Sequence, residues 1–356
     1  MIKILVVDDS ALVRKLIGQA FSTQTDFEVR FARNGREALA AMANSQPDVV
    51  TLDVHMPEMD GLACLDRIMI ESPCPVVMVS SMTAAGADAT LKALRLGAVD
   101  FVAKPTGAVS LRFDDLALPL IEKVRAAAGA RLKTSLRLRE RVRFRFGDSI
   151  PGTPVTPVRK AKQVSKSKGL VLVGTSTGGP PALEVLLTSL PASFPWPIVI
   201  AQHMPASFTG PLARRLDGIS RLDIQEVRDP IPLKPGGVYI GRGDADVIVS
   251  QRGAILVVMA APAQADYPWH PSTDRLVRSA LNYMAPSQLI GILMTGMGND
   301  GAEAMALIHS GGGRTIAEAE ETAVVWGMPG ELVRANGADF VLPLHKIAAR
   351  LKKMVS

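Results

Sequence analysis

Short apolar runs that alternate with stretches of helical spacing are the feature of this 356-residue chain that most limits its fold. An apolar run of five or six residues, without alternating polar side chains, indicates a strand buried on both faces. A helical stretch between two such strands supplies the crossover that a parallel sheet requires. We therefore expect an α/β protein built on doubly wound, mostly parallel sheets.

The first part of the chain predicts a doubly wound parallel sheet of five strands. The expected strands are 2–7, 27–32, 48–53, 75–80 and 99–103. The expected helices are 11–21, 35–44, 61–71 and 87–96. Asn34-Gly35 begins one of these helices and Leu96-Gly97 ends another, as the capping preferences of asparagine and glycine favour. We assign this domain to residues 1–122.

A second α/β domain is expected over residues 169–356. Its buried-strand patterns are 169–174, 197–202, 288–295 and 314–318. Helical patterns follow these strands, notably at 182–190 and 302–309. Between residues 236 and 260, three short strands separated by Gly/Asp turns are typical of an antiparallel segment. The prediction is therefore a doubly wound, mostly parallel sheet with a short antiparallel addition.

The basic charge of the chain is confined to its middle. The net charge is +6, but residues 131–168 alone carry +10 and the rest carries −4. Residues 151–168 contain three prolines and no core pattern, so we expect a basic linker over 123–168. In 136–146, arginine occupies every second position. That pattern fits a solvated linker, a segment that docks on an acidic surface, or a nucleic-acid contact. Local basicity does not predict a nucleic-acid-binding fold, and we expect no nucleic-acid partner.

Three features favour a cytoplasmic protein without membrane insertion. The longest apolar run, 254–263, is far shorter than the roughly 18 residues of a membrane helix. The apolar residues 4–7 are followed at once by two aspartates, unlike a signal peptide. The two cysteines, Cys64 and Cys74, cannot form a disulfide framework.

Three carboxylates follow strands of the first predicted sheet. Asp8 and Asp9 come after the first strand, and Asp53 ends the third. Ligands of such sheets gather at the carboxyl ends of the strands, where a divalent cation relieves the repulsion between acids. Mg²⁺ suits these hard oxygen donors. With Lys104 ending the last strand and Ser80 ending the fourth, the site is suited to taking a phosphoryl group onto an aspartate.

This pattern resembles the receiver domain of response regulators over residues 1 to about 122. The motifs that carry the resemblance are DD at 8–9, TLDVHMPEMDG at 51–61, Ser80, and FVAKP at 101–105. The resemblance implies Asp53 as the phosphoacceptor and a chemotaxis histidine kinase as the phosphodonor. It implies Mg²⁺ ligands from Asp9, Asp53, the His55 carbonyl and, through water, Asp8. It also implies that Lys104 contacts the phosphate, and that the switch pair is Ser80 and Phe101.

A candidate nucleophile opens the second domain. The sequence GTSTGG at 174–179 follows a strand and precedes a helix whose first turn contains Pro180 and Pro181, where proline is tolerated. Its letters match the nucleophile elbow G-x-S-x-G, with Ser176 at the centre. A phosphate-binding turn has a similar composition, but no lysine follows the glycines as a Walker A motif requires.

A serine nucleophile needs a base, and the base needs an orienting acid. Of the five histidines, His203 ends the strand 197–202 on the same sheet edge as Ser176. His270 lies in a loop and could line a cleft. Asp300 lies between a strand and a helix, so Ser176, His203 and Asp300 are expected to converge. The order Ser, His, Asp differs from that of the α/β-hydrolases and disfavours that fold.

Two other functions remain open on the residues alone. Residues 296–301 read G-x-G-x-x-G and Glu320 follows, as in a dinucleotide site. Against this, only 55 residues follow the motif, and Asp300 would point a carboxylate at the pyrophosphate. The other alternative is a DNA-binding output domain that uses the basic segment, but no helix-turn-helix pattern follows the first domain.

The second domain resembles the chemotaxis protein-glutamate methylesterases. The motifs are GTSTGG at 174–179, QHMP at 202–205, FTGPLARRL at 208–216, PSTD at 271–274 and MTGMGNDGA at 294–302. The resemblance implies Ser176 as nucleophile, His203 as base and Asp300 as orienting acid, with Thr175 and Met297 framing the oxyanion site. It implies hydrolysis of glutamate γ-methyl esters on chemoreceptors with release of methanol, glutamine deamidation as a side activity, and no cofactor for the esterase. We expect phosphorylation of the receiver to open the catalytic cleft.

Overall fold

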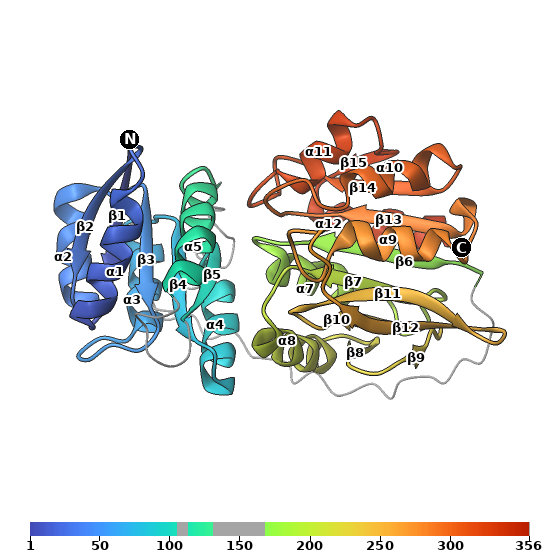
Figure 1. The fold of residues 1–356 in the computed structure, drawn as a ribbon, viewed down its shortest axis with the longest axis horizontal. Helices are drawn as coiled ribbons and strands as arrows, with labels where there is room; N and C mark the ends of the chain where they lie inside the picture. Colours follow the sequence, from blue (N-terminus) through green and yellow to red (C-terminus); the bar gives the residue numbers. More distant parts are fainter. Residues whose placement is uncertain (105–112, 131–167, 356) are drawn as a thin grey trace, which may run out of the picture. The chain divides into compact units, whose positions relative to one another are not determined.

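The computed structural model describes residues 1–104, 113–130 and 168–355. The chain divides into two compact units, 1–157 and 158–356, and each is described by itself (Figure 1). The arginine-rich stretch 136–146 lies outside the described residues, so its three interpretations stay open.

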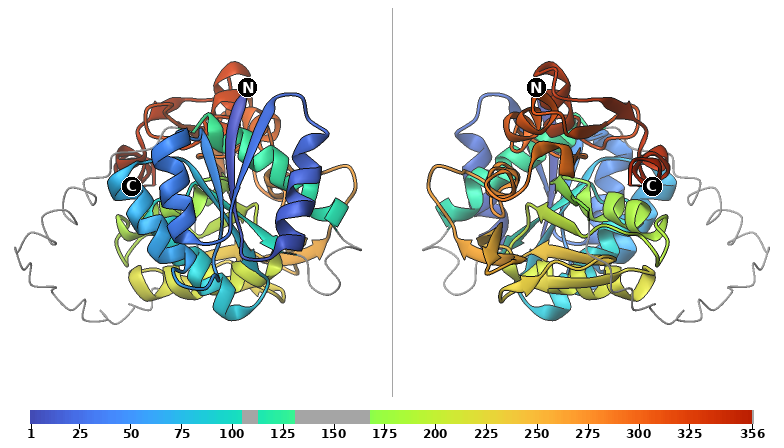
Figure 2. Two further views of the ribbon diagram at one scale, coloured as in Figure 1. Left: turned by 90° about the vertical axis from the view of Figure 1, so that its left-hand side faces the viewer. Right: turned by 90° about the vertical axis from the view of Figure 1, so that its right-hand side faces the viewer.

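The first unit is a parallel five-stranded sheet in the order β2-β1-β3-β4-β5. Its strands are β1 (Ile2–Val7), β2 (Phe27–Ala32), β3 (Val49–Asp53), β4 (Val76–Ser81) and β5 (Asp100–Lys104). Its helices are α1 (Ala11–Ser22), α2 (Gly35–Ser45), α3 (Gly61–Glu71), α4 (Ala84–Leu96) and α5 (Phe113–Ala128). Figure 2 shows helices on both sides of this sheet. The predicted doubly wound receiver fold is confirmed.

Local sequence determines where these helices begin. The side chains of Ser10, Asn34, Asp60 and Thr83 each accept a hydrogen bond from a main-chain N–H in the first turn of α1, α2, α3 and α4. Such caps satisfy donors that the helix itself leaves unpaired. The last helix, α5, runs past residue 122 to Ala128. The domain boundaries expected from the sequence (1–122, 123–168 and 169–356) stay predictions.

The second unit is a parallel seven-stranded sheet in the order β15-β14-β13-β6-β7-β10-β8, with a separate antiparallel sheet β11-β12-β9. The strands of the main sheet are β6 (Leu170–Thr175), β7 (Ile198–Gln202), β8 (Asp223–Val227), β10 (Gly237–Gly241), β13 (Leu289–Leu293), β14 (Arg314–Glu318) and β15 (Phe340–Leu342). The small sheet contains β9 (Ile231–Pro232), β11 (Ala245–Arg252) and β12 (Ile255–Pro262). The helices are α7 (Gly179–Thr188), α8 (Ala206–Ile219), α9 (Thr273–Leu281), α10 (Ala302–Ser310), α11 (Met328–Arg334) and α12 (Leu344–Met354).

The mostly parallel sheet with an antiparallel addition is confirmed, but one strand was assigned to the wrong sheet. Of the three strands expected to be antiparallel within 236–260, β10 pairs in parallel with β7 and β8. All five residues of β10 are buried, as in a strand covered on both faces. Only β11 and β12 form an antiparallel hairpin, and β9 supplies its third strand.

The strand order of the second sheet reverses at β6, and in open α/β sheets such a switch point forms a crevice. From β6 the chain moves to β7 on one side, and it returns later as β13 on the other side. Helices then leave the carboxyl ends of these strands in opposite directions, and open α/β sheets bind ligands at such a position.

Among the described ranges, none of the helices has the length and apolar character that a membrane span needs.

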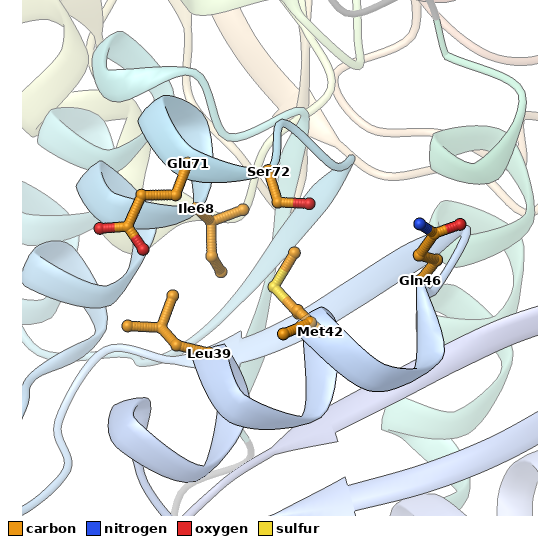
Figure 3. Close-up of a pocket in the computed structure, with 7 residues that line it drawn as sticks. Leu39, Met42, Gln46, Ile68, Glu71 and Ser72 are labelled. Atoms are coloured by element: carbon orange, nitrogen blue, oxygen red, sulfur yellow. The ribbon is translucent and has the colours of Figure 1, made fainter.

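The first unit also has a surface groove between α2 and α3, shown in Figure 3. Leu39, Met42 and Ile68 form its apolar part. Its one ionisable lining residue, Glu71, is held by an ion pair with Arg67 at 2.8 Å. The groove therefore offers no cluster of reactive groups, unlike the carboxyl edges of the two sheets.

Candidate functional site

The first unit brings the three predicted carboxylates together. Asp8 follows β1 and Asp53 ends the neighbouring strand β3. One carboxylate oxygen from each of Asp8, Asp9 and Asp53 lies within 4.8 Å of the others. Asp8 and Asp53 are buried, whereas Asp9 is exposed. This donor set fits Mg²⁺, which prefers a few carboxylates together with water.

Lys104 enters the same pocket from the end of β5. Its Nζ lies 2.9 Å from Asp8 Oδ2 and 2.7 Å from Asp53 Oδ2. Burial raises the pKa of Asp53 above its ordinary value, and the charge and hydrogen bond of Lys104 offset this only in part. Burial alone would lower the pKa of Lys104, but the two carboxylates outweigh it and hold that pKa above its usual range.

The remaining receiver residues lie around this pocket. Ser80, fully buried near the end of β4, donates its hydroxyl to the Gly86 carbonyl at 3.2 Å. Phe101 is buried in β5, with Lys123 Nζ 5.1 Å from the ring centroid. The main-chain N–H of His55 donates to Asp53 Oδ1 at 3.4 Å, while its side chain is exposed. The switch role of Ser80 and Phe101 stays a prediction.

The raised pKa of Asp53 has a measurable consequence for stability. Because the folded state holds the Asp53 proton more tightly than the unfolded chain, stability falls as pH rises through the interval between the two pKa values. At neutral pH the ionised carboxylate therefore destabilises the fold. We expect Asp53→Asn to raise the unfolding midpoint of the first unit in EDTA by about 2–8 °C.

Differential scanning calorimetry of the full chain near pH 7.5 measures this midpoint. Asp88→Asn, at an exposed acid of α4, is the matched control and should leave the midpoint unchanged. A midpoint lowered by Asp53→Asn would show that the ion pair with Lys104 outweighs the burial of the carboxylate.

Ser176 follows β6 at the crevice of the second sheet. Its N–H donates to the Thr295 carbonyl at 3.0 Å, and its side chain remains 8% exposed. The turn depends on glycine, because Gly178 has φ +77°. A Cβ on Gly296 would lie 2.8 Å from the Ser176 Cβ, so the loop after β13 passes directly beside the serine.

His203 lies beside Ser176 on the neighbouring strand. Thr175 of β6 is paired with Gln202 of β7, and the His203 N–H donates to the Thr175 carbonyl at 3.0 Å. The Gln202 side chain donates Nε2 to the carbonyls of both Ser176 and His203, each at 3.0 Å. The serine and the histidine thus leave adjacent strands together, as the sequence predicts, and Gln202 ties their main chains to each other.

The His203 ring is bonded to Asp300 through Nε2. The Nε2–Oδ2 distance is 2.8 Å, and both side chains are nearly fully buried. The other ring nitrogen, Nδ1, is buried and has no hydrogen-bond partner among the described residues. Ser176 Oγ is therefore not bonded to the ring here, although hydrogen bonds of this kind often tighten only when substrate binds. Nδ1 is left as the nitrogen that can accept a proton.

Asp300 is held by the N-terminus of α9. Its Oδ1 accepts from Ser272 Oγ at 2.9 Å and from the Asp274 N–H at 3.0 Å, and its Oδ2 accepts from the Thr273 N–H at 2.6 Å. Burial would raise the pKa of Asp300, but the His203 hydrogen bond and charge, with these N–H donors, hold it below its ordinary value. Asp300 is thus kept as an anion beside the imidazole.

The two residues expected to frame an oxyanion site differ in their surroundings. The hydroxyl of Thr175 is fully buried and donates to the Thr295 carbonyl at 3.1 Å, so it ties β6 to the end of β13. Met297 lies half-buried in the turn after β13, between Gly296 beside Ser176 and Gly298 with φ +78°. The Met297 turn is therefore placed to contact a group bound at Ser176.

Several residues around this site were not found from the sequence. Trp269 stacks on the His203 ring, with centroids 5.9 Å apart and planes 7° from parallel. Glu318, fully buried at the end of β14, accepts from the Thr295 N–H at 2.9 Å. A lone acid closing a buried strand is a usable sequence signal for Glu318, whereas Trp269 lies in a loop without any pattern.

The G-x-G-x-x-G at 296–301 is not arranged for a dinucleotide. The carboxylate of Asp300, inside the motif, is directed into bonds with His203 and α9. A pyrophosphate at this turn would meet that anion. The geometry thus favours the hydrolytic interpretation of these residues.

The fold and the two sites define a class of protein: a receiver domain joined to a doubly wound α/β domain with serine, histidine and aspartate at the crevice of its sheet. Two family models match the chain, the CheB methylesterase model at residues 171–351 and the response regulator receiver domain model at residues 4–113. The chain belongs to the CheB methylesterase family and is an enzyme of the protein-glutamate methylesterase and glutaminase class.

Individual relatives agree with this assignment. A protein-glutamate methylesterase/protein-glutamine glutaminase of Rhodopseudomonas palustris is 56% identical, with 98% of this chain and 97% of the relative covered. A similarly named protein of Rhodospirillum rubrum is 50% identical, with 100% and 97% covered. The solved catalytic domain of Thermotoga maritima CheB methylesterase is 37% identical with a TM-score of 0.51, and covers 53% of this chain and 100% of that domain.

Proposed function

We propose that the chain removes methyl groups from glutamate γ-methyl esters of chemoreceptors and releases methanol, using Ser176, His203 and Asp300. The same site would hydrolyse glutamine side chains to glutamate and ammonia. One observation carries the proposal: a buried carboxylate is bonded to His203 Nε2, while Nδ1 of the same ring has no partner among the described residues and His203 follows the strand next to that of Ser176. A hydroxyl, a base and an orienting acid are the parts that acyl transfer requires.

The bond between His203 and Asp300 supports a separate task for each ring nitrogen. Asp300 accepts the Nε2–H, so the neutral imidazole keeps its lone pair on Nδ1. Nδ1 takes the proton of Ser176 Oγ as the oxygen attacks the ester carbonyl, and returns it to the departing methoxy group. Methanol leaves an acyl-enzyme behind. Nδ1 then takes a proton from water and the hydroxide adds to the acyl carbon. The bond between the acyl carbon and Ser176 Oγ breaks, and Nδ1 returns its proton to Oγ to give glutamate and the free serine. The ring nitrogens thus act in the opposite sense to those of chymotrypsin.

The oxyanion of the tetrahedral intermediate would be bound at the Met297 turn. Hydrogen-bond donors fixed in place before the reaction stabilise such a charge most effectively. Gly296 approaches Ser176 so closely that a side chain there would collide with it, which supports this position. Thr175 would support this turn through its hydrogen bond to the carbonyl of Thr295, the residue before Gly296.

Phosphorylation in the receiver pocket would regulate the esterase reaction, and the enzyme would act in the cytoplasm. Asp53 would accept a phosphoryl group from a chemotaxis histidine kinase, and Asp9, Asp53, the His55 carbonyl and, through water, Asp8 would hold Mg²⁺. The ion supplies charge stabilisation to the transferring phosphoryl group. Lys104, already in contact with Asp53, would turn to the phosphate, and Ser80 with Phe101 would respond to it.

The test of the whole proposal is methanol release from a receptor fragment that carries glutamate γ-methyl esters. We expect the full chain to release methanol, and a small phosphodonor with Mg²⁺ to raise the rate about 5- to 150-fold, the usual range of coupling between sites. Asp53→Asn should keep the unstimulated rate and lose the stimulation. An equal rate with and without the phosphodonor would reject regulation by the receiver, and no methanol under either condition would reject the esterase.

A further inference from the structure

The indole of Trp269 lies between the base and the oxyanion turn. Its plane is nearly parallel to the His203 ring, 7° apart at a centroid distance of 5.9 Å. A Cβ added to Gly298 would lie 2.8 Å from Trp269 Cζ2, so the indole also rests directly on the turn that contains Met297. One side chain therefore touches both elements that have to stay aligned at Ser176.

The loop that carries Trp269 is anchored by the fully buried Asp246 at the start of β11. Its Oδ1 accepts from the Ser272 N–H at 2.7 Å and lies 3.0 Å from His270 Nδ1. Its Oδ2 accepts from Arg275 Nη1 at 2.6 Å, and the same Arg275 nitrogen donates to the Pro262 carbonyl. Residues at both ends of the loop between β12 and α9 are thus fixed by one cluster. Buried groups that are fully paired in this way hold a segment rigidly.

The His203 ring needs a second restraint. Its bond to Asp300 fixes Nε2, but one hydrogen bond leaves the ring free to turn about its Cβ–Cγ bond and move Nδ1 away from Ser176. A flat aromatic contact opposes that rotation, because parallel stacking is lost as soon as the plane turns. The face of an indole also attracts the imidazolium that forms when Nδ1 takes the serine proton.

We propose that Trp269 is a positioning residue for His203: it fixes the imidazole plane so that Nδ1 stays directed at Ser176, and Asp246 holds it there through the loop. The inference rests on the proposed function of His203 as the base. Trp269 acts through the histidine, so its loss slows activation of the serine and leaves the entry of small molecules to the site unchanged.

Labelling of Ser176 by a small alkyl fluorophosphonate tests this in the full chain. The probe reacts with base-activated serines, and its rate separates into binding (KI) and bond formation (kinact). We expect Trp269→Leu to lower kinact about three- to tenfold, as the usual strength of an aromatic stack implies, with KI unchanged. Trp269→Phe and Trp269→Tyr keep a flat ring and should stay within about twofold of the unsubstituted chain.

The matched control is Tyr267→Leu, which removes an aromatic ring from the same loop without touching the His203 stack, and should label at the normal rate. Calorimetric midpoints check folding, and Trp269→Met replaces the leucine variant if that one unfolds. Normal kinact in Trp269→Leu, or Trp269→Phe as slow as Trp269→Leu, or an equal loss in Tyr267→Leu, would each overturn the inference. Probe attached elsewhere in a Ser176→Ala chain would instead contradict the proposed function.

Discussion

Replacing Ser176 with alanine is expected to lower methanol release by about 10⁴- to 10⁶-fold, the loss typical of removing the nucleophile from a triad. In the proposed mechanism this hydroxyl attacks the ester and forms the acyl-enzyme. Among the described residues, the Ser176 side chain makes no hydrogen bond that stabilises the fold, so the structural cost of the change is small. The variant should unfold at the same temperature as the unsubstituted chain.

Gas chromatography of methanol from the methylated receptor fragment measures this loss. Ser189→Ala is the matched control, because Ser189 is an exposed serine at the far end of the helix that follows Ser176, and its hydroxyl donates to the Val185 carbonyl. It should retain the full rate. A Ser176→Ala chain that releases methanol at a rate close to that of the control would assign the nucleophile to another residue.

Most of the fold could be predicted because the strands are covered on both faces. Strands such as β3 and β6 are buried at every position, so their sequences are unbroken apolar runs that alternate with helices. The sequence patterns miss β8 and β15 at the two edges of the second sheet, and they place β10, a short run between glycines, in the hairpin that follows it. Pairing partners depend on the sheet as a whole, and they are not encoded in five residues.

The reacting groups of the candidate site were predictable for a related reason. Ser176 and His203 directly follow strands, Asp300 lies in the loop after another, and the carboxyl ends of neighbouring parallel strands share one edge. The groups that hold them are different. Ser272 and Trp269 come from a loop after the antiparallel hairpin, and their positions depend on the anchor at Asp246. No periodicity in the sequence records such a contact.

The orientation of the imidazole ring likewise depends on contacts in the folded structure and cannot be predicted from the sequence. The sequence pairs His203 with Ser176 and Asp300, but it does not say which ring nitrogen faces which partner. The donors of α9 decide this, because they fix the carboxylate where Nε2 reaches it. In the proposed mechanism, Asp300 is the group that matters most after Ser176, because it determines the tautomer of His203.

Asp300→Asn is accordingly expected to lower kcat about 10⁴-fold, as loss of the correct histidine tautomer does in other triads, and to cost about 1–3 kcal/mol of stability through the lost main-chain hydrogen bond. Both carboxylate oxygens accept main-chain N–H groups, from Thr273 at Oδ2 and from Asp274 at Oδ1. An amide NH₂ that replaces either oxygen therefore faces a main-chain N–H and cannot accept its hydrogen bond. Where it replaces Oδ2 it also donates to His203, which moves the ring proton to Nδ1 and removes the lone pair that Ser176 needs.

The control for this variant is Asp274→Asn, a half-buried acid of the same cluster. Burial and the nearby charge of Asp300 raise the pKa of Asp274, so its carboxylate is not favoured by its surroundings. Its Oδ1 accepts the Ala304 N–H at 3.0 Å, and an asparagine oxygen can accept the same bond. We expect a loss of less than about tenfold, since the His203 tautomer is untouched. Equal kcat losses in the two variants would mean that Asp300 serves the packing of α9 rather than the tautomer of the base.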